Sequence, residues 1–167
     1  MKDKKEFRIY AKSIQKQLDL ESLSKIAVKK IRSFSGYKKA KNVMLYYPLP
    51  TELDLRDLFK DNKRFYLPKV SGKTLLVCPY CESLIKSDFN IMEPDTTPVE
   101  PSELDLIIVP ALMADKNCYR LGHGGGYYDR FLSTCNIPTV TVLPKELVCD
   151  ELPHEEYDIK VNKILKM

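Results

Sequence analysis

Apolar residues at helical spacing predict two amphipathic helices at the start of the chain. In the first segment, the apolar side chains that share one face are Phe7, Tyr10, Ile14 and Leu18. The second helix is expected to follow Asp19, a favourable N-cap residue, and to end near Gly36, where a C-terminal cap belongs. Its apolar face consists of Leu23, Ile26, Ala27, Ile31 and Phe34. Both stripes have the period of helices that pack one face against a core.

The rest of the chain alternates between short apolar runs and further helical patterns. The runs that predict strands are NVMLYY (42–47), RFYLP (64–68), TLLVCP (74–79), LDLIIVP (104–110) and PTVTVL (138–143). Helices are expected over residues 53–61 and 127–135, and a long surface loop over residues 93–103. The nearly unbroken apolar run 104–110 is typical of a parallel strand covered on both faces. We therefore expect an α/β fold with three layers, in which a mostly parallel central sheet carries helices on both faces.

Length, composition and charge fit one domain spanning residues 1–167. The chain is 44% hydrophobic and 30% charged, as in ordinary globular domains. No apolar run approaches the ~20 residues that cross a membrane, and the first residues lack the apolar stretch of a signal peptide. We therefore expect a cytoplasmic protein without a membrane partner, whose five cysteines are free thiols. The net charge of +4 suits anionic small molecules, and no dense basic run indicates a nucleic-acid partner.

The stretch CYRLGHGGGYYDRFL, residues 118–132, holds four of the six glycines of the chain. It follows the strand 104–110, and ligands of such folds bind beyond the carboxyl ends of the strands. The glycines let backbone amides converge on an anion, and a helix starting near Tyr127 adds its N-terminal partial charge. Arg120 could bind phosphate oxygens and Asp129 could bind Mg²⁺. A nucleotide loop is one interpretation, although the stretch matches neither GxxxxGK[ST] nor GxGxxG.

Two other interpretations of the same stretch stay open at this point. HGGG, residues 123–126, matches the oxyanion-hole motif of lipases and esterases, but the GxSxG nucleophile motif that this chemistry requires is missing. The glycines could also form a plain flexible turn, with His123 as an exposed polar residue.

A second motif, CPYC at residues 78–81, matches the active site of many glutaredoxins. In that chemistry the first thiol has a lowered pKa at a helix N-terminus, and a helix is possible directly after the motif. The simpler interpretation is that Cys78 and Cys81 pack at the end of a strand. The remaining cysteines and histidines have no spacing that predicts a zinc site.

Several segments together resemble the 5-formyltetrahydrofolate cyclo-ligase family. The stretch YRLGHGGGYYDRFL is similar to the signature of that family. The other similar segments follow in the family's order: KKEFR (4–8), YYPLPTELDL (46–55), RFYLPKV (64–70), FNIMEP (89–94), LDLIIVP (104–110) and LPHEEYDIKVNKIL (152–165). The resemblance implies ATP- and Mg²⁺-dependent conversion of 5-formyltetrahydrofolate to 5,10-methenyltetrahydrofolate, with release of ADP and phosphate. It implies a phosphorylated formyl group, an iminophosphate, as intermediate, and small-molecule partners only. We expect a monomer.

The resemblance also implies a role for individual residues. The residues that would contact ATP are Lys4, Arg8, Arg120, Leu121, Gly122, His123, Gly124, Gly125, Gly126, Tyr127 and Tyr128, and of these Arg120 and Tyr128 would be catalytic. The residues that would contact the folate are Tyr47, Glu52, His123, Gly124, Gly125, Gly126 and Tyr127. The residues that would bind Mg²⁺ are Asp129 and Asp158.

Five residues differ from those usual in the family, among them Leu55, which replaces a threonine. Ala111 and Cys118 stand where glycines are usual, Ala114 replaces an aromatic residue and Tyr157 replaces a histidine. None of them is an implied phosphate or metal ligand, so we expect effects on substrate affinity and rate more than on the type of reaction. The alternative functions are a non-catalytic binder of folate or nucleotide and, on the CPYC motif, a thiol oxidoreductase that uses Cys78 and Cys81.

Overall fold

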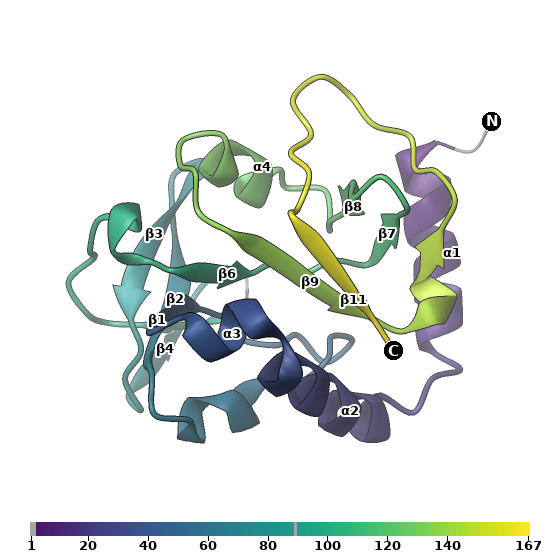
Figure 1. Cartoon of the computed structure of the whole chain (residues 1–167). Coiled ribbons are helices and arrows are strands. Elements are labelled where there is room, and N and C mark those ends of the chain that lie inside the picture. Colours follow the sequence, from purple (N-terminus) through teal and green to yellow (C-terminus); the bar gives the residue numbers. More distant parts are fainter. Residues whose placement is uncertain (1–2, 89) are drawn as a thin grey trace.

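A computed structural model describes residues 3–88 and 90–167 (Figure 1). Phe89, which opens the segment FNIMEP, lies outside the described residues. The helices are α1 (Lys4–Gln15), α2 (Leu20–Ser33), α3 (Ser35–Lys39) and α4 (Tyr127–Leu132), and the 3₁₀ turns are η1 (Arg56–Lys60), η2 (Pro101–Glu103) and η3 (Lys145–Leu147). The strands are β1 (Asn42–Met44), β2 (Arg64–Ser71), β3 (Thr74–Pro79), β4 (Leu84–Lys86), β5 (Met92–Pro94), β6 (Leu106–Ile108), β7 (Met113–Asp115), β8 (Arg120–Leu121), β9 (Thr139–Leu143), β10 (Val148–Cys149) and β11 (Lys163–Lys166).

The two helices predicted at the start of the chain are present, and local side chains cap them. Asp3 and Glu6 form a reciprocal capping box at the start of α1. Asp19 accepts the backbone N–H of Ser22 at the start of α2, as predicted. The prediction that Gly36 caps α2 is wrong, because α2 ends at Ser33 and Gly36 lies within α3. A Cβ at Gly36 would lie 2.5 Å from the ring of Phe34, so glycine permits this close approach.

The central sheet has the strand order β11-β9-β6-β1-β2-β3. All neighbouring strands run parallel except β3, which pairs antiparallel with β2. The chain therefore builds the sheet outward from β1 in two directions, first through β2 and β3, and later through β6, β9 and β11. The carboxyl ends of β1 and β6 form the crevice at which open α/β sheets bind their ligands.

Helices cover both faces of this sheet. Figure 1 shows α2 and α3 on one side and α4 on the other, and separate apolar clusters lie under each side. Beside the main sheet, α1 packs through Ala11 and Phe7 on the three-stranded sheet β10-β7-β8. The predicted α/β class, with a mostly parallel sheet between two helical layers, is confirmed. No helix within residues 3–88 and 90–167 is both long and apolar enough to cross a membrane.

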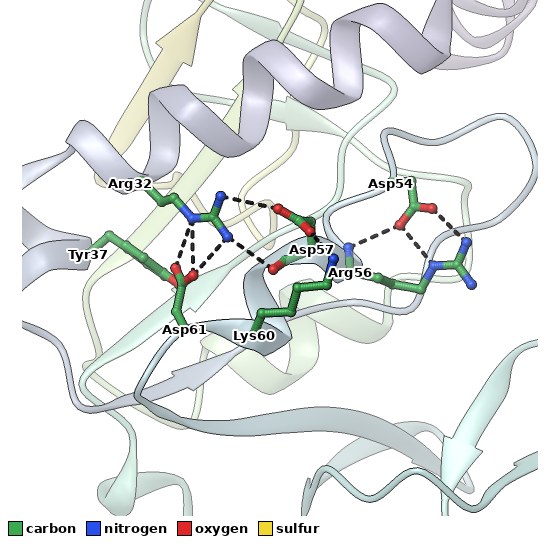
Figure 2. Close-up of polar contacts among 7 residues, drawn as sticks. All are labelled: Arg32, Tyr37, Asp54, Arg56, Asp57, Lys60 and Asp61. Atoms are coloured by element: carbon green, nitrogen blue, oxygen red, sulfur yellow. Dashed lines mark hydrogen bonds and ion pairs between the residues drawn. The ribbon is translucent and has the colours of Figure 1, made fainter.

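Tertiary contacts override some of the local predictions. The helix predicted over residues 53–61 is only the short turn η1, because Tyr46 and Ser24 bind the backbone of Leu53 and Asp54 and hold it extended. On its outer side, η1 is tied to α2 and α3 by a network in which Arg32 bonds Asp57 and Asp61, and Tyr37 bonds Asp61 (Figure 2).

The structure also corrects three predictions about the type or the bounds of an element. The helix predicted over residues 127–135 stops at Leu132, where the hydroxyls of Ser133 and Thr134 donate to backbone carbonyls of the last turn. The predicted loop 93–103 contains part of β5 and the turn η2, and the possible helix after CPYC is the strand β4. Between β6 and the glycine-rich stretch lies β7, which pairs with β8.

Candidate active site

One pocket of about 860 Å³ collects every residue to which the family resemblance assigns a role. Its wall combines the first turns of α1, the loop after β1, the whole stretch 120–130 and the segment Glu155–Ile159. Its volume is in the range of small-molecule sites. The site residues that it brings together are Lys4, Arg8, Tyr47, Glu52, Arg120, Leu121, Gly122, His123, Gly124, Gly125, Gly126, Tyr127, Tyr128, Asp129 and Asp158. Their individual roles stay predictions.

Lys4 joins the start of the chain to its C-terminal loop. Its Nζ lies 2.6 Å from Asp158 Oδ2 and 3.5 Å from a Glu155 oxygen. The ring of Tyr157 lies beside the same ammonium group, with its centroid 5.4 Å away. Asp158 Oδ2 also accepts the backbone N–H of Glu155. An implied phosphate ligand and an implied metal ligand are therefore each other's counter-ion in this structure.

Arg8, one helical turn after Lys4, holds the glycine loop. Its Nε donates to the carbonyl of Gly122 at 2.9 Å. Gly124 has a φ of +110°, and a Cβ there would lie 3.4 Å from the Arg8 guanidinium carbon. At Gly126 the φ is +68°, and a Cβ would come within 2.7 Å of Arg130 Nη1. Glycine is favoured at both positions because L side chains rarely adopt these positive φ values, whereas the ends of the two flexible arginines could move aside.

The most deeply buried charge of the pocket is Arg120. Its side chain is 3% exposed, and Nη2 donates to Asp129 Oδ1 at 3.1 Å. Burial lowers the pKa of Arg120, and the Asp129 carboxylate opposes this shift. The same Asp129 oxygen accepts the backbone N–H of Ile159. Among the described residues, Arg120 Nε and the Tyr128 hydroxyl are buried and have no hydrogen-bond partner.

Tyr128 lies against Arg120, whose guanidinium carbon is 5.6 Å from the ring centroid. Burial raises the pKa of Tyr128 well above its ordinary value. The phenol therefore keeps its proton at neutral pH and can act as a hydrogen-bond donor. A buried Nε–H of Arg120 and a buried Tyr128 hydroxyl, which both lack an acceptor among the described residues, suit an anionic ligand.

The loop after β1 contributes a carboxylate on the opposite side of the crevice. Glu52 is 9% exposed; Oε1 lies 3.0 Å from His123 Nε2, and Oε2 accepts the backbone N–H of Leu49 at 2.8 Å. Tyr47 lines the pocket and also packs against the core cluster beneath α2 and α3. Its hydroxyl accepts a hydrogen bond from Arg56, which Asp54 holds in place (Figure 2).

Part of the pocket wall could not be found from motifs. One lobe is lined by apolar residues and one acid, namely Pro68, Val70, Leu75, Ile91 and Glu93. Apolar strand residues carry no sequence signal that separates a pocket wall from a core. Arg130 lies within the glycine-rich stretch, and its donation to the carbonyls of Gly125 and Lys73 becomes visible only in the fold.

The CPYC motif lies outside this pocket and lacks the features of a redox site. Cys78 is buried within β3, and burial raises the pKa of its thiol. The element that follows is the strand β4, so no helix N-terminus is available to stabilise a thiolate. Cys81 Sγ donates to the carbonyl of Ser83. The geometry therefore favours two cysteines packed at a strand end.

The structure places the unusual residues in definite surroundings: the ring of Tyr157 lies beside Lys4, Leu55 is fully buried in the core, and Ala111 packs against the cluster beneath α1. Cys118 has a φ of +69°, a left-handed conformation that favours glycine. Ala114 is fully buried in β7, where it packs in the cluster beneath α1.

Known proteins resemble this chain along most of its length. The model of the 5-formyltetrahydrofolate cyclo-ligase family matches residues 4–167. The 5-formyltetrahydrofolate cyclo-ligase of Mus musculus is 28% identical over 164 residues, which cover 85% of this chain and 81% of the mouse protein. That of Haemophilus influenzae is 32% identical over 143 residues, 77% of this chain and 76% of the relative.

A solved structure agrees with the sequence relatives. The NMR structure of Aquifex aeolicus 5,10-methenyltetrahydrofolate synthetase superposes with a TM-score of 0.86 at 34% identity. The superposition covers 98% of this chain and 89% of that protein. With the match of the family model over residues 4–167, this chain belongs to the 5-formyltetrahydrofolate cyclo-ligase family.

Proposed function

We propose that the protein converts 5-formyltetrahydrofolate to 5,10-methenyltetrahydrofolate and consumes ATP with Mg²⁺. The observation that carries this proposal is a pair of buried donors beside the glycine loop of the pocket wall. They are Arg120 Nε and the Tyr128 hydroxyl, which have no hydrogen-bond partner among the described residues. Such donors fit the phosphates of a nucleotide. The relatives named for this reaction supply its chemistry.

The carboxylates of the pocket fit Mg²⁺ that arrives with a nucleotide. Asp129 and Asp158 both line the pocket. Among residues 3–88 and 90–167, no three or more histidine, cysteine, aspartate or glutamate side chains are grouped to hold a metal. Mg²⁺ is commonly bound by one or two carboxylates together with phosphate oxygens and water. When bound, it would neutralise charge on the phosphates.

The residues of this chain have separate tasks in the proposed reaction. Phosphorylation of the formyl oxygen by the γ-phosphate makes that oxygen a good leaving group. N10 then attacks the formyl carbon, and phosphate leaves as the five-membered ring closes. Because phosphoryl transfer depends mostly on positioning and charge neutralisation, Lys4, Arg8 and Arg120 would bind the phosphates. Neutral Tyr128 would donate a hydrogen bond to the transferred group, and Glu52 would accept N–H groups of the pterin.

Turnover is tested by the near-ultraviolet absorbance of the methenyl product. Purified protein with 5-formyltetrahydrofolate, ATP and Mg²⁺ is expected to give a rising absorbance and stoichiometric ADP, and EDTA is expected to stop both. Arg120→Met is expected to abolish turnover, whereas Cys81→Ser, outside the pocket, is expected to leave it unchanged. Folded wild-type protein that gives no product would overturn the proposal. Folate binding without ADP release would assign the alternative function, a non-catalytic binder.

A further inference from the structure

The contact between His123 and Glu52 bridges the two sides of the ligand crevice. Glu52 belongs to the loop after β1, whereas His123 belongs to the glycine loop that leads from β8 into α4. The carboxylate and the imidazole meet at 3.0 Å between Oε1 and Nε2. β1 and β6 lie at the point where the strand order of the central sheet reverses. The contact joins the loop after β1, which leads towards β2, to the glycine loop, which follows β8 of the three-stranded sheet.

The hydrogen bonds of Glu52 leave it able to accept two further donors. Oε2 accepts the backbone N–H of Leu49, and Oε1 faces His123. Each carboxylate oxygen accepts about two hydrogen bonds, so one acceptor site remains on each oxygen. A bidentate pair of N–H groups, such as the amino and ring N–H of a pterin, requires one site on each oxygen. The imidazole therefore does not compete with such a ligand.

The imidazole fixes the rotation of the carboxylate. A terminal carboxylate torsion of glutamate is broad and only weakly restrained by itself. The Leu49 N–H restrains one oxygen of Glu52, and His123 restrains the other. The backbone that carries His123 is itself held, because Arg8 bonds the carbonyl of Gly122 and Arg130 bonds that of Gly125. The restraint on the carboxylate thus comes from the same loop that would contact ATP.

We propose that the His123 side chain is a positioning residue, which orients Glu52 for the two N–H donors of the pterin. This inference rests on the proposed function and adds a role for the His123 side chain, which that function does not assign. The competing explanation is that His123, 39% exposed, is an ordinary polar surface residue. In that case its removal leaves folate affinity unchanged.

The first test is calorimetry with 5-formyltetrahydrofolate in the absence of ATP. His123→Ala is expected to weaken binding about fivefold, the effect of losing one partly exposed hydrogen bond to a charged group. His123→Gln keeps an N–H donor at similar reach and is expected to restore most of the affinity. His154→Ala is the matched control, because the other histidine of the chain lies outside the pocket and stacks on Tyr119. Its folate affinity is expected to equal that of the wild type.

A double-mutant cycle separates positioning from a general effect on the pocket. In a Glu52→Gln background, His123→Ala is expected to change folate affinity less than twofold, because the charged acceptor is gone. In steady-state kinetics, His123→Ala is expected to raise KM for the folate with a smaller change in kcat. Unchanged folate affinity in His123→Ala, or effects of the two substitutions that add, would overturn the inference.

Imidazole NMR gives a readout that does not depend on turnover. The chain has two histidines, so side-chain ¹⁵N spectra contain two imidazoles, which His154→Ala assigns. Both Glu52→Gln and added 5-formyltetrahydrofolate are expected to shift the His123 resonances and leave those of His154 in place. A His123 signal that responds to neither contradicts the inference. A wild-type protein that binds no folate at all refutes instead the proposed function.

Discussion

Replacing Asp129 by asparagine tests the buried charge pair of the pocket. Asp129 balances Arg120, whose side chain is 3% exposed, and accepts the N–H of Ile159 through the same oxygen. Asparagine can still accept the Ile159 N–H, but it removes the negative charge beside the guanidinium. The pair Arg32–Asp61 offers a comparison outside the pocket, because it is also an arginine–carboxylate contact and its arginine is far more exposed than Arg120 (Figure 2).

The expected magnitudes follow from burial. Breaking a buried ion pair by removing one partner costs ~3–5 kcal/mol. The two carboxylates are similarly exposed, 20% for Asp129 and 21% for Asp61, so the expected difference rests on the arginines. Because Arg120 is only 3% exposed, we expect Asp129→Asn to lower the free energy of unfolding by about 2–3 kcal/mol. Arg32 is 38% exposed, and solvent screens its pair. Asp61→Asn is therefore expected to cost about 1 kcal/mol, including the lost charge-assisted bond from Tyr37.

Urea denaturation and thermal unfolding of the three proteins measure these differences. For a chain of this length, the losses correspond to a fall in Tm of roughly 6–9 °C for Asp129→Asn and roughly 3 °C for Asp61→Asn. Mg²⁺ and ATP together are expected to raise the Tm of the wild type and of Asp61→Asn, and to raise that of Asp129→Asn much less. Equal destabilisation by the two substitutions would refute the argument from burial. An unchanged turnover rate of Asp129→Asn at limiting Mg²⁺ would refute the metal role.

Three further predictions concern single side chains. Burial raises the pKa of Asp61, but hydrogen bonds from Arg32 and Tyr37 outweigh it and lower the pKa below its ordinary value. The stabilisation by the Asp61 carboxylate is therefore fully present above the pKa of the unfolded chain, about 3.9, and is lost as the pH falls through the lower pKa of the folded protein. The urea midpoints of Asp61→Asn and the wild type are expected to converge over that pH range. Cys118→Gly is expected to be about 1 kcal/mol more stable to urea than Cys118→Ala, because alanine keeps the left-handed strain; equal midpoints contradict this. Cys78 is expected to react with a thiol reagent at neutral pH only after unfolding, and rapid native labelling would revive the redox hypothesis.

The sequence predicts the layers of this fold better than its smaller elements. Long periodic segments such as α2, with its cap at Asp19, and apolar runs such as the one that contains β6 carry their own signal. The hairpin β7–β8 does not, because strands of two or three residues are too short to show a period. The full helix predicted around η1 does not form because the preceding backbone is bound by side chains that a helical period does not include: Tyr46 bonds Leu53, seven positions away, and Ser24 bonds Asp54, 30 positions away.

The sequence predicts a set of residues that line the pocket, but it does not predict the contacts among them. From spacing alone, Lys4 and Arg8 read as a solvated helix face, and only the family resemblance assigns them to a nucleotide. Even so, the resemblance gives no reason to expect that Lys4 pairs with Asp158, 154 positions away. That contact follows from the packing of α1 beside the C-terminal loop, which no local pattern encodes.

Three contacts in this pocket join an implied anion-binding residue to an implied ligand of metal or folate, and Lys4 has a second carboxylate, Glu155, 3.5 Å away. The pairs are Lys4–Asp158, Arg120–Asp129 and His123–Glu52. This arrangement keeps the charges of the pocket balanced without substrates, so the wall can hold its shape while largely shielded from water. It also sets a condition on binding. A phosphate that draws Lys4 away leaves Asp158 without its counter-charge, and this loss is offset only when a cation arrives with the phosphate. Under the proposed function, the charge pairs would therefore favour joint binding of nucleotide and divalent cation over binding of either one alone. A pocket built from unpaired arginines and lysines would bind a nucleotide without needing the cation.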